Sequence, residues 1–164
     1  MPSLPLNKAN LPYPDPIHPI VVHFVIAMVV FAFLFDVVGY LTRNHRLFEV
    51  SFWNMFVASA AIFVAVIFGQ FEAGLAQAYD AVKPVLSQHT ITGWSLSAIV
   101  VAITAWRFVI RSRDPLKIPP AYLGVAAFLI CVVAFQVYLG TQLVWEYGLH
   151  VEPVEQAIAK GILK

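Results

Sequence analysis

The chain has 164 residues, of which 60% are hydrophobic and only 12% are charged, roughly half the charged fraction of a soluble globular domain. Its formal net charge is +1, and it has no run of Lys and Arg that would favour a nucleic-acid partner. The single cysteine, Cys131, excludes an internal disulfide and a CxxC metal or haem-attachment motif. The composition therefore predicts an integral membrane protein.

The elements expected along the chain are a terminal arm, four membrane spans and a tail. Residues 1–16 contain five prolines, which favour an extended arm over a helix. Four apolar stretches follow, each reaching the roughly 20 residues that a helix needs to cross a bilayer. Residues 148–164 form a short, mildly amphipathic tail. The predicted spans are residues 17–41, 52–73, 85–110 and 121–147.

Basic residues are concentrated in the first and third connectors and at the edges of the adjoining spans. The positive-inside rule places such connectors in the cytoplasm, so both termini are expected on the non-cytoplasmic side. Short connectors favour an up-down-up-down bundle, and the predicted fold is an all-α integral membrane four-helix bundle. These basic residues are Arg43, Arg46, Arg107, Arg111, Arg113 and Lys117.

Four of the five histidines, His18, His23, His89 and His150, fall at the outer end of this bundle. An imidazole among lipid-facing residues is costly, so it usually has a partner or a ligand. His23 follows Pro19 by four residues and His89 follows Pro84 by five. If each proline marks a first helical turn, both imidazoles lie about 6–7.5 Å below their helix starts. The spacing predicts His23 and His89 as axial ligands of a haem iron.

Other residues fit around such a cofactor, and each also has a simpler explanation. Gly93 and Gly140 would clear space for a flat macrocycle, although glycines more often permit close helix packing. A second haem would use His18 and His150. Alternatively, His18 caps a helix, His150 is a solvated tail residue, and His23 is a buried histidine bonded to Gln70 or Glu72.

A discrete metal site competes for the same residues. His18, His23, His89 and Glu72 suit zinc or copper by ligand type. However, His18 and His23 are five residues apart, which turns them about 140° from each other on a helix. The sequence contains no Gly-rich phosphate loop, no HExxH motif and no plausible catalytic triad. Enzymatic activity is therefore a weaker expectation than electron transfer or an accessory role.

Four short motifs at the ends of the spans give the chain a family resemblance over residues 17–151. It resembles the DUF2231 family of predicted bacterial membrane proteins, which implies a four-span bundle. Similar members occur joined to a Rieske-type iron–sulfur domain, which implies redox work on the outer face with a separate oxidase, Rieske or cytochrome subunit as partner. The motifs are His18-Pro19-x3-His23-Phe24, Gly69-Gln70-x-Glu72-Ala73, His89, and Gly140-x2-Leu143-Val144-x2-Tyr147-Gly148-x2-Val151.

The sequence is thus interpreted as a cytochrome-like electron-transfer subunit of a respiratory or photosynthetic complex. It would bind b-type haem between spans one and three near the outer surface of a bacterial plasma membrane or thylakoid. One alternative is a cofactor-free accessory subunit of such a complex. The other is a quinone- or metal-binding membrane protein that uses His18, Glu72 and His150.

Overall fold

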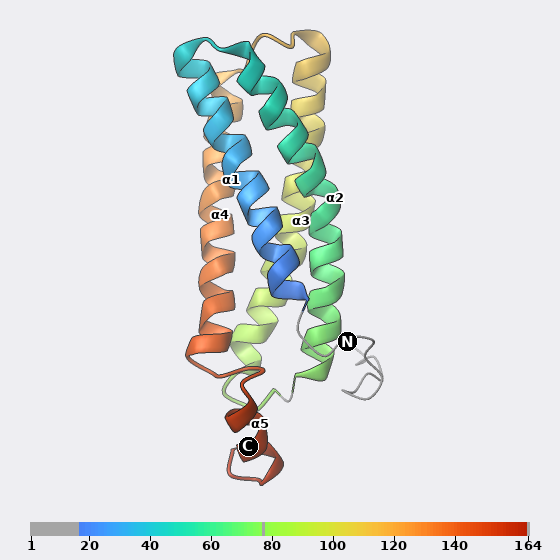
Figure 1. Ribbon diagram of the computed structural model, residues 1–164, viewed down its shortest axis with the longest axis vertical. Helices are drawn as coiled ribbons and strands as arrows, with labels where there is room; N and C mark the ends of the chain where they lie inside the picture. The colour runs from blue at the N-terminus through green and yellow to red at the C-terminus, as the bar shows by residue number, and fades with distance from the viewer. Residues whose placement is uncertain (1–16, 77, 164) are drawn as a thin grey trace.

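The computed structural model describes residues 17–76 and 78–163, so the predicted arm, residues 1–16, lies outside the described part. Four long helices stand side by side as a bundle, and a fifth, short helix follows them (Figure 1). No strand occurs among the described residues, which confirms the all-helical prediction. The helices are α1 His18–Thr42, α2 His45–Leu75, α3 Lys83–Arg113, α4 Pro120–Trp145 and α5 Glu152–Ala159.

The packing order around the bundle decides which side chains can meet. Helix α1 contacts α2 and α4, and α3 contacts the same two helices, so α1 and α3 are diagonal partners. The α1–α2 and α3–α4 connectors lie at one end of the bundle, which we call the connector end (Figure 1). The α2–α3 connector and α5 lie at the opposite end.

The helix ends follow from local sequence signals. Pro19, Pro84 and Pro120 occupy the first turns of α1, α3 and α4, where a missing backbone N–H costs nothing. Arg43 ends α1 in the left-handed conformation, at φ 57°. The Asn44 side chain then accepts the Arg46 N–H and caps α2. Helix α2 therefore starts at His45, before the predicted second span begins at residue 52. The prediction rested on hydropathy, which marks the membrane-crossing part of a helix and not the polar turns that precede it.

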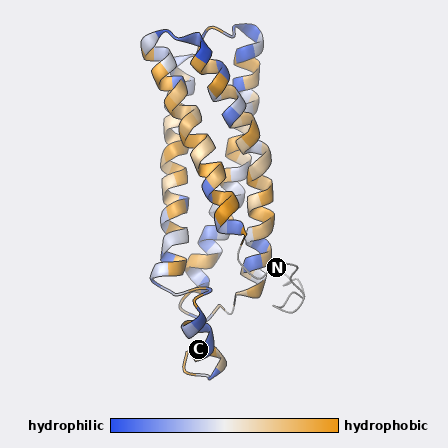
Figure 2. Cartoon of the chain, in the orientation of Figure 1, coloured by the Kyte–Doolittle hydropathy of each residue, from blue (hydrophilic) through white to orange (hydrophobic). Residues whose placement is uncertain are grey.

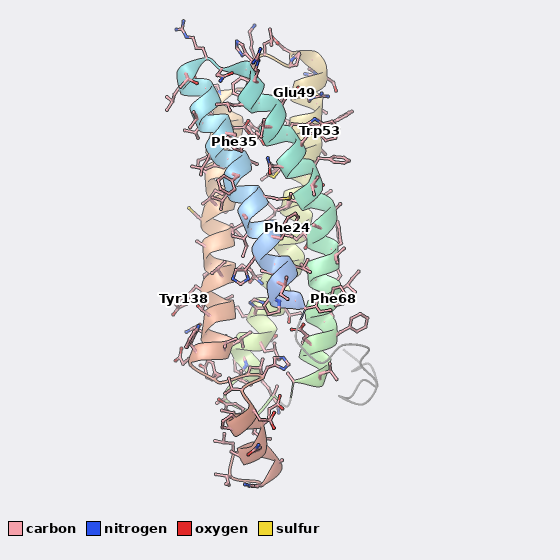
Figure 3. The ribbon with its side chains drawn as sticks, viewed as in Figure 1. Phe24, Phe35, Glu49, Trp53, Phe68 and Tyr138 are labelled. Carbon is pink, nitrogen blue, oxygen red and sulfur yellow. The ribbon has the colours of Figure 1, made fainter. Side chains whose placement is uncertain are left out.

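All four long helices have the length and apolar composition needed to cross a membrane. Apolar residues cover the shafts of the bundle and polar residues gather at its ends (Figure 2). Large side chains such as Phe24, Trp53 and Tyr138 (Figure 3) are 54–56% exposed. Apolar surface on this scale would be unfavourable in water. The chain is therefore a multi-pass membrane protein with lipid-facing helices.

The centre of the bundle is a continuous apolar core to which all four long helices contribute. Small residues allow the closest approaches, and Ala58 of α2 is completely buried. Near the connector end this core gives way to polar groups. The buried core members include Val25, Val29, Ala32, Met55, Ala58, Ile62, Leu96, Val100, Ile103, Ala126, Leu129 and Val133.

A charged pair, Asp36 of α1 and Arg107 of α3, bridges the diagonal of the bundle. Each side chain is only 1% exposed, and Nη2 of Arg107 lies 3.6 Å from Oδ1 of Asp36. The same Nη2 donates to the Phe48 carbonyl at 3.1 Å. The guanidinium also lies between the rings of Phe48 and Tyr122, 5.9 and 5.7 Å from their centroids. Arg107, assigned from the sequence to the cytoplasmic edge of its span, is thus a buried core residue.

Ser51 and Tyr122 complete this layer, so each long helix supplies one polar residue. Both side chains lie beside the Asp36 carboxylate, and both residues are buried. We call Asp36, Ser51, Arg107 and Tyr122 the charged layer. An ionised group in hydrocarbon is tolerated when its partners come from neighbouring helices, so this layer fixes how the four helices register against one another.

Replacing Arg107 alone should be far more damaging than replacing the whole ion pair. Arg107→Met leaves the Asp36 carboxylate buried without its cation, which is expected to cost about 3–5 kcal/mol of unfolding free energy. The double variant Asp36→Leu/Arg107→Met should recover most of this loss, since two apolar side chains can pack there. Unfolding in mixed detergent micelles measures both values, with exposed Arg113→Met as control. Equal losses in single and double variants would contradict the pairing.

Candidate functional site

The second polar layer lies at the end of the bundle where α1 begins, and His18 is its first member. Its backbone N–H donates to Oε1 of Glu72 at 2.8 Å, so a buried carboxylate from α2 caps the positive end of α1. Its ring Nδ1 lies 2.7 Å from the carbonyl oxygen of Ala65. Because a carbonyl only accepts, Nδ1 carries the proton. The Nε2 nitrogen of His18 therefore keeps its lone pair.

His89 of α3 is the second member, and it is held by Gln136 of α4. The Gln136 Nε2 donates to the backbone carbonyl of His89 at 3.0 Å. It also lies 3.2 and 3.3 Å from the two ring nitrogens of His89, and donates to whichever is unprotonated. The Oε1 atom of Gln136 is buried and has no hydrogen-bond partner among the described residues. A buried acceptor without a partner is uncommon, so this oxygen is available to a ligand.

The two imidazoles meet across the diagonal of the bundle. The ring centroids of His18 and His89 are 6.4 Å apart, and the ring planes are nearly perpendicular, at 89°. Both residues are half-buried. We call His18, Glu72, His89 and Gln136 the histidine layer. Like the charged layer, it draws one residue from each long helix.

Glycines make room for these side chains. A Cβ at Gly69 would lie 2.9 Å from Cε1 and Nδ1 of the His18 ring. A Cβ at Gly140 would lie 3.2 Å from Cε1 of His89, and one at Gly93 would lie 3.3 Å from Nε2 of Gln136. Gly93 and Gly140, expected to clear space for a macrocycle, thus lie against the layer's own polar side chains.

A fixed spacing relates the two histidines, and the glycines that lie against them, to the charged layer. Asp36 follows His18 by 18 residues, and Arg107 follows His89 by 18. Gly69 follows Ser51, and Gly140 follows Tyr122, by the same 18. Eighteen residues are five full turns and about 27 Å of helix, so both members of each pair lie on one helix face. This separation is close to the roughly 30 Å thickness of the hydrocarbon core.

The structure joins His89 to His18, and it places His23 elsewhere. His23 is exposed, and its Nδ1 donates to the Pro19 carbonyl of its own helix at 2.5 Å. The two α1 histidines point about 140° apart, so only one of them can face the core. Helix α3 also extends further than α1 at this end (Figure 1). Residues at the same distance from the starts of these two helices therefore do not lie at the same height in the bundle.

The remaining predicted site residues do not join the layer as a group. His150 follows α4 in a left-handed conformation, at φ 64°, and its Nδ1 lies 3.9 Å from Oε1 of Glu155 in α5. His150 therefore lies beside α5. Among residues 17–76 and 78–163, no group of three or more His, Cys, Asp or Glu side chains is placed to hold a metal ion. The set of His18, His23, His89 and Glu72 therefore gains no support as a discrete zinc or copper site.

Sequence reasoning did not identify Gln136 as the partner of His89, nor Gly69 as the residue that accommodates His18. The Gly69-Gln70 pair appeared only as part of a motif. The 18-residue spacing from Ser51 could have found Gly69, but it does not mark Gln136, which follows Tyr122 by 14 residues. Spacing by whole turns selects residues on one helix face.

Comparison with models of protein families gives a match over most of the chain. The family model described as "Predicted membrane protein (DUF2231)" matches residues 14–153. No curated protein and no solved structure matches the chain.

The contact between Gly69 and His18 predicts the effect of a single methyl group. In Gly69→Ala the new Cβ displaces the ring from the Ala65 carbonyl, and overpacking costs about 1–3 kcal/mol. Higher helix propensity offsets about 1 kcal/mol at most, so a lower unfolding free energy is expected. The matched control is Gly74→Ala in the same helix, where a Cβ meets no atom within 4 Å. Equal effects of the two substitutions, measured by unfolding in mixed micelles, would contradict this packing.

Proposed function

The chain belongs to the DUF2231 family of predicted membrane proteins, and from its histidine layer we propose that it is an electron-transfer subunit holding one b-type haem. His18 of α1 and His89 of α3 are the proposed axial ligands. His18 thus replaces His23 as the partner of His89. The haem iron would carry single electrons and supply the redox chemistry, while the protein holds and orients it.

The observation that carries this proposal is the separation of the two imidazoles. Two histidines that bind one metal from opposite sides have ring centres roughly 6 Å apart, since each metal–nitrogen distance is about 2 Å. The observed separation of the His18 and His89 centroids is 6.4 Å. The two rings come from diagonal helices, so they can approach a shared ligand from opposite sides.

The hydrogen bonds around His18 support a ligand role. Metal-binding histidines usually donate their second ring N–H to a carbonyl or carboxylate, which fixes the tautomer and the ring orientation. The Nδ1–H of His18 does this with the Ala65 carbonyl, and it leaves the Nε2 lone pair for a metal. The unpartnered Oε1 of Gln136 adds a polar acceptor beside His89.

The position of the layer supports exchange of electrons with another chain. The positive-inside rule puts the connector end in the cytoplasm, which places the histidine layer and both termini near the outer surface. The topology is then up-down-up-down. A redox subunit of Rieske, cytochrome or oxidase type on that surface could exchange electrons with the layer, in a bacterial plasma membrane or a thylakoid.

A second candidate function is that of a cofactor-free accessory subunit. It is favoured by the hydrogen bonds that the two histidines already form within the protein. His18 bonds to Ala65 and Glu72, and His89 bonds to Gln136. Such a layer would set helix register in the same way as Asp36 and Arg107. The two candidates differ in whether the purified protein absorbs visible light.

The haem proposal predicts a b-type Soret band in protein purified from haem-replete cells. His18→Ala and His89→Ala should each abolish this band, because each removes an axial ligand. His23→Ala and His150→Ala are the matched controls, and both should keep it. A colourless but folded wild-type protein would favour the cofactor-free candidate. Loss of the band in His23→Ala with retention in His18→Ala would overturn the ligand assignment.

The proposed orientation has its own measurement. In a Cys131→Ala background, a cysteine at Lys160 should react with a membrane-impermeant maleimide added to intact cells. A cysteine at Arg113 should react only after the membrane is opened. Both positions are exposed, so a difference between them reports the side of the membrane. The reverse labelling pattern would place the histidine layer at the cytoplasmic surface.

A further inference from the structure

A pocket at the connector end combines an apolar wall with a basic rim. It has a volume of about 410 Å³ and opens between the α1–α2 and α3–α4 connectors. Phe48, Ile118 and Pro119 contribute apolar wall, and Arg43, His45 and Lys117 contribute the polar rim. This pocket is separate from the histidine layer, which lies at the other end of the bundle.

Arg43 is the rim residue whose charge is least compensated. It is exposed, and it forms no ion pair with another described residue. Two other arginines at this end have carboxylate partners: Arg111 pairs with Glu49 at 2.9 Å, and Arg107 pairs with Asp36. The left-handed conformation of Arg43 ends α1 beside the pocket. An unpaired guanidinium offers two parallel N–H groups, which match a phosphate group.

Lys117 supplies the second cation of the rim. Its Nζ lies 3.3 Å from Oδ2 of Asp114, and the lysine side chain is 82% exposed. The Asp114 carboxylate also accepts the Leu116 N–H at 3.0 Å, and this bond holds the pKa of Asp114 below its usual value. One carboxylate contact uses one of the three ammonium donors. The ammonium group can therefore also donate to an anion in the pocket.

We infer that this pocket binds the headgroup of an anionic phospholipid. The phosphate would lie between Arg43 and Lys117, and the start of the acyl chains would pack against Phe48, Ile118 and Pro119. A soluble phosphate would gain nothing from the apolar wall, whereas a lipid uses both parts of the pocket. Basic pockets between membrane helices are suited to anionic headgroups.

The position of the pocket agrees with this ligand. Its lining residues come from the end of α1, the starts of α2 and α4, and the connectors. At this end the apolar shafts of the helices give way to polar residues (Figure 2), which is the level expected for headgroups of one leaflet. Tyr40, which also lines the pocket, is 44% exposed, and aromatic side chains of this kind favour the membrane–water interface. Under the proposed orientation this leaflet is the cytoplasmic one, where anionic lipids create a negative surface potential.

The test compares two double variants with the same change in net charge. Arg43→Asn/Lys117→Gln removes both rim cations, and asparagine tolerates the left-handed conformation at position 43. Arg46→Gln/Arg113→Gln removes two exposed cations of the same end that do not line the pocket. Native mass spectrometry of the full chain in detergent measures binding of phosphatidylglycerol, with phosphatidylcholine as the neutral comparison.

The rim variant should bind phosphatidylglycerol about 25-fold more weakly than the wild type, at roughly fivefold for each cation removed near the surface. The control variant should retain near-wild-type binding, and phosphatidylcholine should bind weakly to all three proteins. Equal losses in the two double variants would overturn the inference, because attraction would then be diffuse. Equal affinity for both lipids, or displacement by millimolar inorganic phosphate, would overturn it as well.

Discussion

The arrangement of this bundle depends on one constraint, which is that polar side chains in an apolar bundle must find their partners on neighbouring helices. Asp36 and Arg107 are each 1% exposed and lie on diagonal helices, so neither can be satisfied by its own helix alone. The same holds for His18, whose partners are Ala65 and Glu72 of α2. Apolar packing brings the helices together, but it does not choose one register over another. The polar contacts do.

Two polar layers separated by an apolar core give the bundle two ends of different character. The charged layer is fully buried, and aromatic rings cover the guanidinium of Arg107, although Oδ1 of Asp36 and Nε of Arg107 also lack a hydrogen-bond partner among the described residues. The histidine layer is only half-buried, and it retains unused capacity at Nε2 of His18 and Oε1 of Gln136. A half-buried layer with a free imidazole lone pair can be reached by a ligand, whereas a fully buried ion pair cannot. This difference is why the proposed redox function rests on the histidine layer.

The membrane character, the all-helical class and the family could all be predicted from the sequence. They depend on hydropathy, on helix length and on short motifs, and the residues of each motif lie close together along the chain. His89 was also singled out from the sequence, because an imidazole within an apolar span stands out by composition alone, and the structure places it against Gln136 and His18. Even the 18-residue spacing is present in the sequence, although it gains meaning only once its members are known to meet.

What the sequence alone determined is which residues are unusual for a membrane span, namely Asp36, Arg107 and the histidines. Only the tertiary structure decided which of them meet. The choice of His18 over His23 depends on the rotation of α1 about its own axis. The pairing of Asp36 with Arg107 depends on the burial of the Arg107 side chain among the other three long helices. Rotation and relative height are set by the packing of α1 against α2 and α4, and these are contacts between distant parts of the chain. A single helix carries no information about them.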